Sequence, residues 1–293
     1  MFLIFINDLP NASKFYIKLF ADDTFLCAQN KDFSHLENEV NTELDKVFVW
    51  LASNKLTLNI KKSKFMIVTN KRGIPKFSVK VNATELESCD SYKYLGVVID
   101  KNLSWQSHAE YLSTKISKAC GALTKLRNCV KIDVLKNVYH ALFHSYIRYG
   151  IVIWGHAAPA VLNPLQTLMN RAIRIMTYAP FGNIDLNPVY KELKLLQVSK
   201  VCSLETGKFE FKRNKNLLPT QIGRYFEDSS TQEITHSHNL RSRNSNAPPR
   251  FISEKFTGEK SIQYKGAQIW NSLPTGIKSS SESLNIRGLA FYF

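Results

Sequence analysis

Two adjacent carboxylates, Asp22 and Asp23, are the residues best placed for chemistry in this sequence. They lie between two apolar segments, FYIKLF and FLCA, so the pattern predicts a β-hairpin with both acids at its tip. Neighbouring like charges on a structured turn repel each other, and a divalent cation commonly relieves that repulsion. Oxygen ligands of this kind suit Mg²⁺, and a pair of such ions stabilises the attacking and leaving oxygens of nucleotidyl transfer. Asp-Asp is also a favourable turn sequence with no chemical role, so the pair needs supporting motifs.

The segments that would position this pair alternate between helix and strand. An amphipathic helix is predicted over residues 33–54, with Asp32 or Ser34 as its cap. Its apolar residues recur at spacings of three, four and seven, as one buried side requires: Phe33, Leu36, Val40, Leu44, Val47, Phe48 and Leu51. Strands are predicted within 55–68, in FSVKVNATEL and in YKYLGVVID, where Gly96 marks a tight bend.

Beyond residue 104 the apolar spacing becomes helical. Two helices are predicted within 104–150, another over 162–178, and two more within 185–212. Residues 228–249 are polar and aperiodic, which indicates a linker or an extended surface strap. The late segment YKGAQIWNSLPTGI contains aromatic and apolar residues that we expect to pack back onto the rest of the chain.

Composition indicates a globular protein with a polyanionic partner. Hydrophobic residues make up 44% and charged residues 22%, which excludes a wholly disordered chain. The net charge is +15, and residues 101–220 contain 17 Lys and Arg against 6 Asp and Glu, whereas residues 1–100 contain 13 against 12. Nucleic acid is the expected partner of the middle third, and a merely solvated basic surface is the alternative.

Cysteine usage and hydropathy exclude other classes. The cysteines are odd in number (5) and form no CxxC pair, which argues against a disulfide framework, a disulfide-linked partner and a zinc ribbon, and favours an intracellular protein, nuclear or cytoplasmic. No apolar run approaches the roughly 20 residues of a membrane span, so no membrane partner is expected. The opening FLIFI resembles the end of a buried element more than a signal peptide.

Several segments together resemble the reverse transcriptases of non-LTR (LINE, jockey-type) retrotransposons. FADD (20–23), LTLNIKKSKFMIV (56–68) and YKYLGVVIDKNLSW (92–105) resemble three successive blocks of that family. The opening FLIFINDLP, YGIVIWG (149–155) and YKGAQIWNSLP (264–274) are similar to flanking parts of the same proteins. The resemblance implies the later part of an RNA-directed DNA polymerase domain plus a downstream region.

The resemblance also implies roles for individual residues. Asp22 would be the principal Mg²⁺ ligand with Asp23 assisting, and both would be catalytic. Phe20 and Ala21 match the two positions before them, where a small residue leaves room for the primer end. Lys62 would contact the pyrophosphate leaving group as a positive charge or a proton donor. Lys61 and Lys64 are alternative candidates for this role, and the other interpretation of all three is as solvent-exposed lysines with no catalytic role. The hairpin that grips the primer strand would be formed by Tyr94, Leu95 and Gly96.

The basic helices after residue 104 resemble the thumb of that family. Their partners would be an RNA template and a DNA primer, with a deoxynucleotide as substrate of the complete enzyme. Aromatic residues among them, such as Tyr139 and Trp154, are expected to be core residues, not platforms on which nucleic-acid bases stack. Phosphates would be contacted by Lys115, Lys118, Lys125, Arg127, Lys131, Lys136, Arg171 and Arg174.

A polymerase palm needs a further metal-binding aspartate before the hairpin. Only 21 residues precede Asp22, and the acid among them, Asp8, resembles a loop residue. We therefore expect a polymerase fragment that is inactive alone. The alternatives are a non-catalytic nucleic-acid-binding remnant and a decayed reading frame that aggregates. His140 and His144 have a metal-binding spacing but no third ligand nearby, so they are expected to be core or surface histidines. His236 and His238 resemble an element near the C-terminus of that family.

The predicted fold class is α+β. We expect a partial ferredoxin-like polymerase palm over 1–103, a helical thumb over 104–180, and a basic C-terminal region over 181–293 that includes the strap 228–249.

Overall fold

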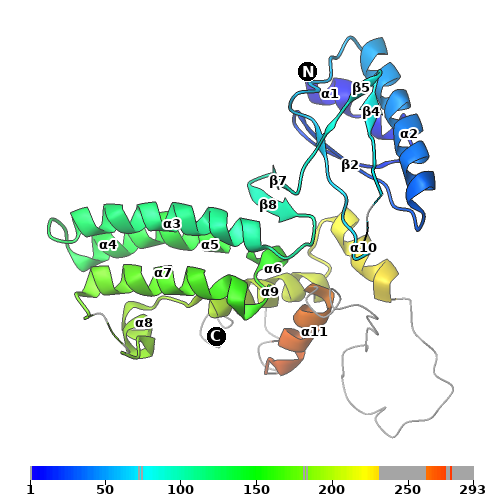
Figure 1. Ribbon diagram of the computed structural model, residues 1–293. Coiled ribbons are helices and arrows are strands. Elements are labelled where there is room, and N and C mark those ends of the chain that lie inside the picture. Colours follow the sequence, from blue (N-terminus) through cyan, green and yellow to red (C-terminus); the bar gives the residue numbers. More distant parts are fainter. Residues whose placement is uncertain are drawn as a thin grey trace, which may run out of the picture. The chain divides into compact units, whose positions relative to one another are not determined.

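The protein is described by a computed structural model, in which residues 2–71, 73, 75–180, 182, 184–230, 262–274 and 278 are placed. The chain divides into two compact units, Met1–Leu103 and Ser104–Phe293 (Figure 1). Each unit has its own hydrophobic core, so each is described by itself.

The first unit is built around a β-hairpin and one long helix. Strands β1 (Tyr16–Phe20) and β2 (Asp23–Cys27) pair antiparallel, as predicted. Helix α2 (Phe33–Ser53) also confirms its prediction, and the Asp32 carboxylate caps it by accepting a hydrogen bond from the His35 amide at 2.8 Å. The buried side of α2 packs on the hairpin and on α1 (Phe2–Ile6) and the 3-10 turn Leu9–Asn11 through a core of Ile6, Leu9, Ile17, Val47 and Leu51.

Helix α1 differs from the expected buried element. Ile6 is buried, but Phe2, Leu3, Ile4 and Phe5 are exposed, with Ile4 at 80%. Periodicity alone cannot show whether a short apolar run is covered, because covering depends on what other elements pack against it.

The other strands of the first unit are short. β3 (Lys64–Phe65) pairs in parallel with β6 (Glu87–Ser88), β4 (Lys80–Val81) pairs with β5 (Thr84–Glu85), and β7 (Ser91–Tyr94) pairs with β8 (Val97–Asp100). Each sheet in the described part of the chain is two-stranded, so the unit is a mixture of helix and small sheets, and the ferredoxin-like palm is not confirmed.

The strand predicted within 55–68 is reduced to β3. Residues 59–63 form a tight turn instead, in which the Ser63 hydroxyl and the Lys62 and Ser63 amides all bond to Asn59. A side chain that accepts backbone hydrogen bonds competes with strand pairing, which explains the shortening.

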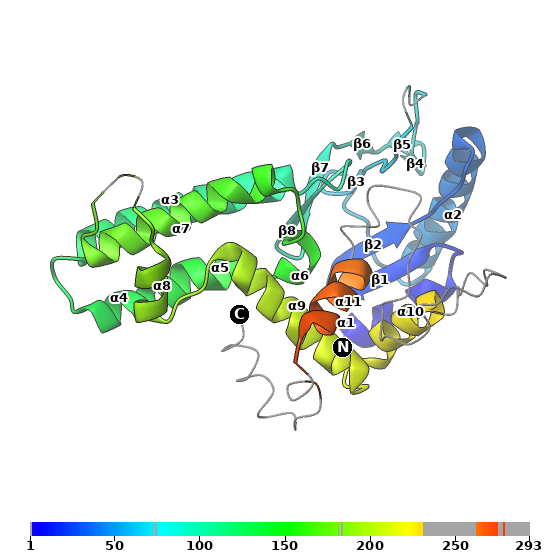
Figure 2. The same ribbon diagram turned by 90° about the horizontal axis from the view of Figure 1, so that it is seen from below.

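The second unit is helical. It contains α3 (Gln106–Leu126), α4 (Ile132–Tyr139), a π-helical turn (His140–His144), α5 (Ser145–Arg148), α6 (Ile151–Trp154), α7 (Pro159–Thr177), α8 (Asn187–Leu193), α9 (Val198–Asn214), α10 (Thr220–Ser230) and α11 (Ile262–Ser272). Helices α3 and α7 lie side by side (Figure 2). They enclose a core that includes Ile116, Leu123, Tyr139, Trp154 and Leu165.

The late segment 264–274 packs onto the rest of the chain, as predicted, and its partner, which the sequence did not indicate, is α9. It forms most of α11, which lies against α9 through Trp270 and Leu273, whose neighbours are Phe211 and Leu204. The strap lies outside the described residues from 231 onward, together with His236 and His238. None of the helices in the described ranges is both long and apolar enough to cross a membrane.

Candidate active site

The two acids lie at the turn of the β1–β2 hairpin. Phe20 and Asp23 are the last paired residues, so Ala21 and Asp22 alone connect the strands. Ala21 has a positive φ of 52° and Asp22 does not, the pattern of a type II′ turn, whose twist matches that of the flanking strands. Asp22 therefore lies in the turn and Asp23 opens β2, and both are exposed.

Strand alternation separates the two faces of the hairpin. Ile17, Leu19 and Leu26 face the core beneath α2. Asp23 and Phe25 are two residues apart, so they share the opposite, outer face. The exposed ring of Phe20, cross-strand partner of Asp23, lies on this face too. The outer face thus combines a carboxylate with aromatic rings.

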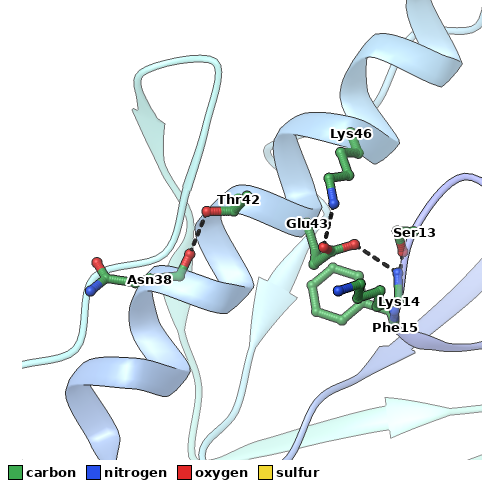
Figure 3. Close-up of polar contacts among 7 residues, drawn as sticks. All are labelled: Ser13, Lys14, Phe15, Asn38, Thr42, Glu43 and Lys46. Atoms are coloured by element: carbon green, nitrogen blue, oxygen red, sulfur yellow. Dashed lines mark hydrogen bonds and ion pairs between the residues drawn. The ribbon is translucent and has the colours of Figure 1, made fainter.

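A buried glutamate fastens the hairpin to α2 (Figure 3). Glu43 is 4% exposed, and its carboxylate accepts a hydrogen bond from the Lys14 amide at 2.7 Å and pairs with the Lys46 ammonium at 2.6 Å. The hydrogen bond from Lys46 lowers the pKa of Glu43, so the anion persists under ordinary conditions. Because Lys14 lies just before β1, this contact fixes where the strand leading to the aspartates begins.

The β7–β8 hairpin has a two-residue turn as well. Leu95 (φ 45°) and Gly96 (φ 84°) both have positive φ, as a type I′ turn requires. Glycine adopts this conformation freely, whereas leucine does so only at a cost. Nine other non-glycine residues in the described part of the chain also have positive φ, so this conformation defines the turn type and does not by itself mark a functional site.

The structure brings the two hairpins together. The rings of Phe25 and Tyr94 lie with centroids 5.5 Å apart and are tilted by 40°. Burial raises the pKa of Tyr94, and the nearby negative charge of Asp23 raises it further. Two of the motifs singled out in the sequence, 71 positions apart, are therefore neighbours in space.

The donors at the turn suit magnesium but are only two. Carboxylate oxygens are the ligands that Mg²⁺ prefers, and it is commonly bound by one or two carboxylates together with substrate phosphates. No group of three acidic, histidine or cysteine side chains with metal-binding geometry occurs in the part of the chain that the structure describes. Asp22 and Asp23 thus match part of a magnesium site.

The three candidate lysines are not equivalent. Lys64 pairs with Glu87 at 2.8 Å across β3 and β6, so its charge is already neutralised. Lys61 and Lys62 are exposed, and neither ammonium makes an ion pair within the described residues. The assignment of Lys62 to the leaving group stays a prediction.

The eight basic residues predicted to contact phosphates are charged side chains without acidic partners among the described residues. Lys118 and Lys125 lie on the side of α3 turned away from its buried residues, whereas Lys115 is half-buried at the edge of that side, with its ammonium 5.7 Å from the centre of the Tyr111 ring. Arg127 and Arg174 line one shallow pocket at the ends of α3 and α7. Lys131 lies at the start of α4 and Lys136 within it, and Arg171 lies on α7.

The aromatic residues between these cations are largely structural. Tyr139 and Trp154 are buried in the core, as predicted, whereas Tyr149 in the same stretch is 56% exposed. His140 and His144 lie with ring centroids 5.4 Å apart on the π-helical turn, and burial lowers the pKa of both.

Two residues of this region escaped the sequence analysis. Phe25 could have been found, because it shares the strand face of Asp23 by alternation. Glu43 gave no signal, because one acid in the middle of an amphipathic helix reads as solvent-facing until its tertiary partner is known.

Comparisons with known proteins find reverse transcriptases of mobile elements. Residues 1–99 match the family model described as reverse transcriptase (RNA-dependent DNA polymerase). The chain is similar to the RNA-directed DNA polymerase from mobile element jockey of Drosophila melanogaster, 22% identical over 62% of this chain and 21% of that protein. It is 26% identical to the jockey polymerase of Drosophila funebris over the same shares. The probable RNA-directed DNA polymerase from transposon BS of Drosophila melanogaster is 23% identical over 76% of this chain and 26% of its own length.

The chain therefore spans about a fifth to a quarter of the length of these curated relatives. No solved structure gave a significant match.

Proposed function

We propose that this chain, which is homologous to the RNA-directed DNA polymerases of non-LTR retrotransposons, supplies the catalytic hairpin and the primer-binding elements of such a polymerase. The first unit would be part of a ferredoxin-like palm and the helices of 104–180 would be its thumb. The partners would be an RNA template, a DNA primer and a deoxynucleotide.

The observation that supports this proposal best is the meeting of the two hairpins. A nucleotidyl transfer needs carboxylates held beside the end of the growing strand. Here the Phe25–Tyr94 contact holds the β7–β8 turn next to the strand that begins with Asp23.

The residues divide the work as follows. Asp22 and Asp23 would hold Mg²⁺, which when bound neutralises charge on the phosphates. The turn of Leu95 and Gly96 brings backbone close to the primer, because glycine has no side chain to obstruct the approach. Lys62, exposed and unpaired within the described residues, would offer a proton or a positive charge to the departing pyrophosphate.

We further infer that these 293 residues alone do not polymerise. Two carboxylates do not fix the geometry of a two-metal site, and no described residue adds a third ligand. A longer polypeptide that contributes the remaining aspartate and the nucleotide-binding residues would complete the site.

Primer extension tests this proposal. The chain would be joined to the preceding polymerase segment of a jockey relative and assayed on an RNA template with a DNA primer. Asp22→Asn keeps the side-chain volume but removes the negative charge, and we expect at least a roughly 100-fold loss of rate, equivalent to about 3 kcal/mol. The matched control is Asp8→Asn, because the exposed Asp8 side chain makes no capping hydrogen bond. Equal activity of the Asp22→Asn variant and the control would refute the assignment.

A second candidate function is binding of nucleic acid without catalysis, favoured by the eight cations that have no acidic partner among the described residues. Contacts of this kind release counterions, so affinity would fall steeply with salt and would not require Mg²⁺. A filter-binding titration of the unmodified chain at several salt concentrations, with and without Mg²⁺, separates this function from a metal-dependent one.

A further inference from the structure

A shallow pocket lies where α3 and α7 end. It is formed by two arginines, an exposed tyrosine and three apolar or small residues: Arg127, Arg174, Tyr178, Ile175, Ala179 and Pro180. All of these lie in the second unit, 104 or more positions from the aspartates in sequence. The catalytic assignment does not use this pocket.

The tyrosine is held firmly although it is exposed. Tyr178 is the C-terminal cap of α7 with a φ of 58°, and 57% of its surface is accessible. Its hydroxyl donates to Asn128 Oδ1 at 2.6 Å and lies 3.1 Å from the Arg127 carbonyl oxygen. The Arg127 guanidinium lies 4.0 Å from the ring centroid, so charge and ring form one assembly.

The second arginine is fixed by the loop that follows α7. Arg174 donates from Nε to the carbonyl oxygen of Pro180 at 3.3 Å and from Nη2 to that of Gly182 at 2.9 Å. A guanidinium has five N–H groups, so this anchoring leaves donors for a ligand.

No acidic residue lines the pocket, and neither arginine has an ion pair within the described ranges. A guanidinium without a carboxylate partner presents a planar set of donors to phosphate, and this pocket contains two such groups. Their structural alternative is a brace, because cations near helix C-termini interact favourably with the exposed carbonyl groups.

We propose that this pocket binds one nucleotide of single-stranded nucleic acid, with its phosphate on Arg127 and Arg174 and its base against the Tyr178 ring. The proposal rests on the nucleic-acid binding proposed above and specifies which strand this end of the unit contacts. Bases within a duplex are already stacked on each other, so a protein ring gains little from them. A base in a single strand is free to stack on an aromatic side chain.

The test is fluorescence anisotropy on the full chain with three labelled probes of equal length: a single-stranded oligonucleotide, its duplex, and a single strand of abasic sites that retains the phosphates. Tyr178→Asn removes the ring while retaining a residue that tolerates positive φ, so the helix end is preserved. We expect it to weaken single-strand binding about tenfold and to leave duplex and abasic binding within about twofold. Tyr178→Phe retains the ring and should bind like the unmodified chain.

Lys118→Gln is the matched control. It removes a cation of the same unit outside the pocket, so it should weaken all three probes alike. If Tyr178→Asn weakens all three equally, or none, the pocket is a brace and the proposal is wrong. If the unmodified chain binds no probe, nucleic-acid binding by this unit is wrong as well, which distinguishes the two failures.

Discussion

The packing of helix α11 on Glu210 of α9 can be tested by the pH dependence of the free energy of unfolding. The Glu210 side chain is fully buried, and Gly266 of α11 lies directly over it, because a Cβ added at Gly266 would approach Glu210 Oε1 to 2.1 Å. The facing cation is Arg213, whose Nη2 lies 3.1 Å from Glu210 Oε2. Burial raises the pKa of Glu210 from 4.5 to about 7, although Arg213 acts in the opposite direction.

The sign and size of the effect follow from linkage. Below pH 4.5 the carboxyl is neutral in both folded and unfolded chains, so its burial costs no ionisation energy. Between pH 4.5 and about 7 the unfolded chain loses this proton while the folded chain keeps it, so stability falls across that window and the loss is complete once the folded chain must hold a buried anion. A difference between 4.5 and about 7, at ~1.4 kcal/mol for each pKa unit, corresponds to about 3 kcal/mol.

The measurement compares Glu210→Gln with the unmodified chain by urea unfolding at pH 5 and pH 8, followed by far-UV circular dichroism. Glutamine stays neutral, so its stability relative to the unmodified chain should increase by about 3 kcal/mol between the two pH values. Taking the difference is essential, because burial lowers the pKa of His108 and of His156 to about 4. These two histidines make both proteins less stable as pH falls below 6.5, a trend opposite to that of Glu210.

The matched control is Glu192→Gln, the same substitution at an exposed position of α8. A Glu210→Gln effect that is the same at pH 5 and pH 8 would show that α11 does not bury this carboxyl.

Three further predictions concern turns and packing. Leu95→Asn places a residue suited to positive φ before Gly96, so thermal denaturation should show a stability gain of about 0.5–1 kcal/mol. If Leu95 contacts the primer, the same substitution should slow primer extension by the completed polymerase. Gly155→Ala should cost about 2 kcal/mol in urea unfolding, because the new Cβ would lie 2.5 Å from the Ile151 carbonyl oxygen; Gly121→Ala, with open space around it, should instead stabilise by up to about 1 kcal/mol. Leu123→Ala leaves a cavity between α3 and α7 and should cost about 2–5 kcal/mol in the same assay, and a smaller loss would mean that the two helices collapse onto the gap.

Local patterns in the sequence determined much of this protein. The Asp-Asp hairpin, helix α2 with its Asp32 cap, and the helices α3, α7, α8 and α9 follow from apolar spacing and turn residues, because those signals act within a few residues of each other. The order of three motifs also indicated the reverse transcriptase relationship that the comparisons found.

The tertiary structure decided which residues that are distant in sequence contact each other. Spacing along the chain could not show that Tyr94 contacts Phe25, that Glu43 fastens the hairpin, or that Tyr178 holds Arg127 at a helix end. It also could not show that residues 59–63 turn instead of extending. The first three depend on contacts between distant residues, whose energies do not exist until the chain has folded. The turn at 59–63 is local, but there the Asn59 side chain competes for a backbone hydrogen bond, which apolar spacing does not reveal.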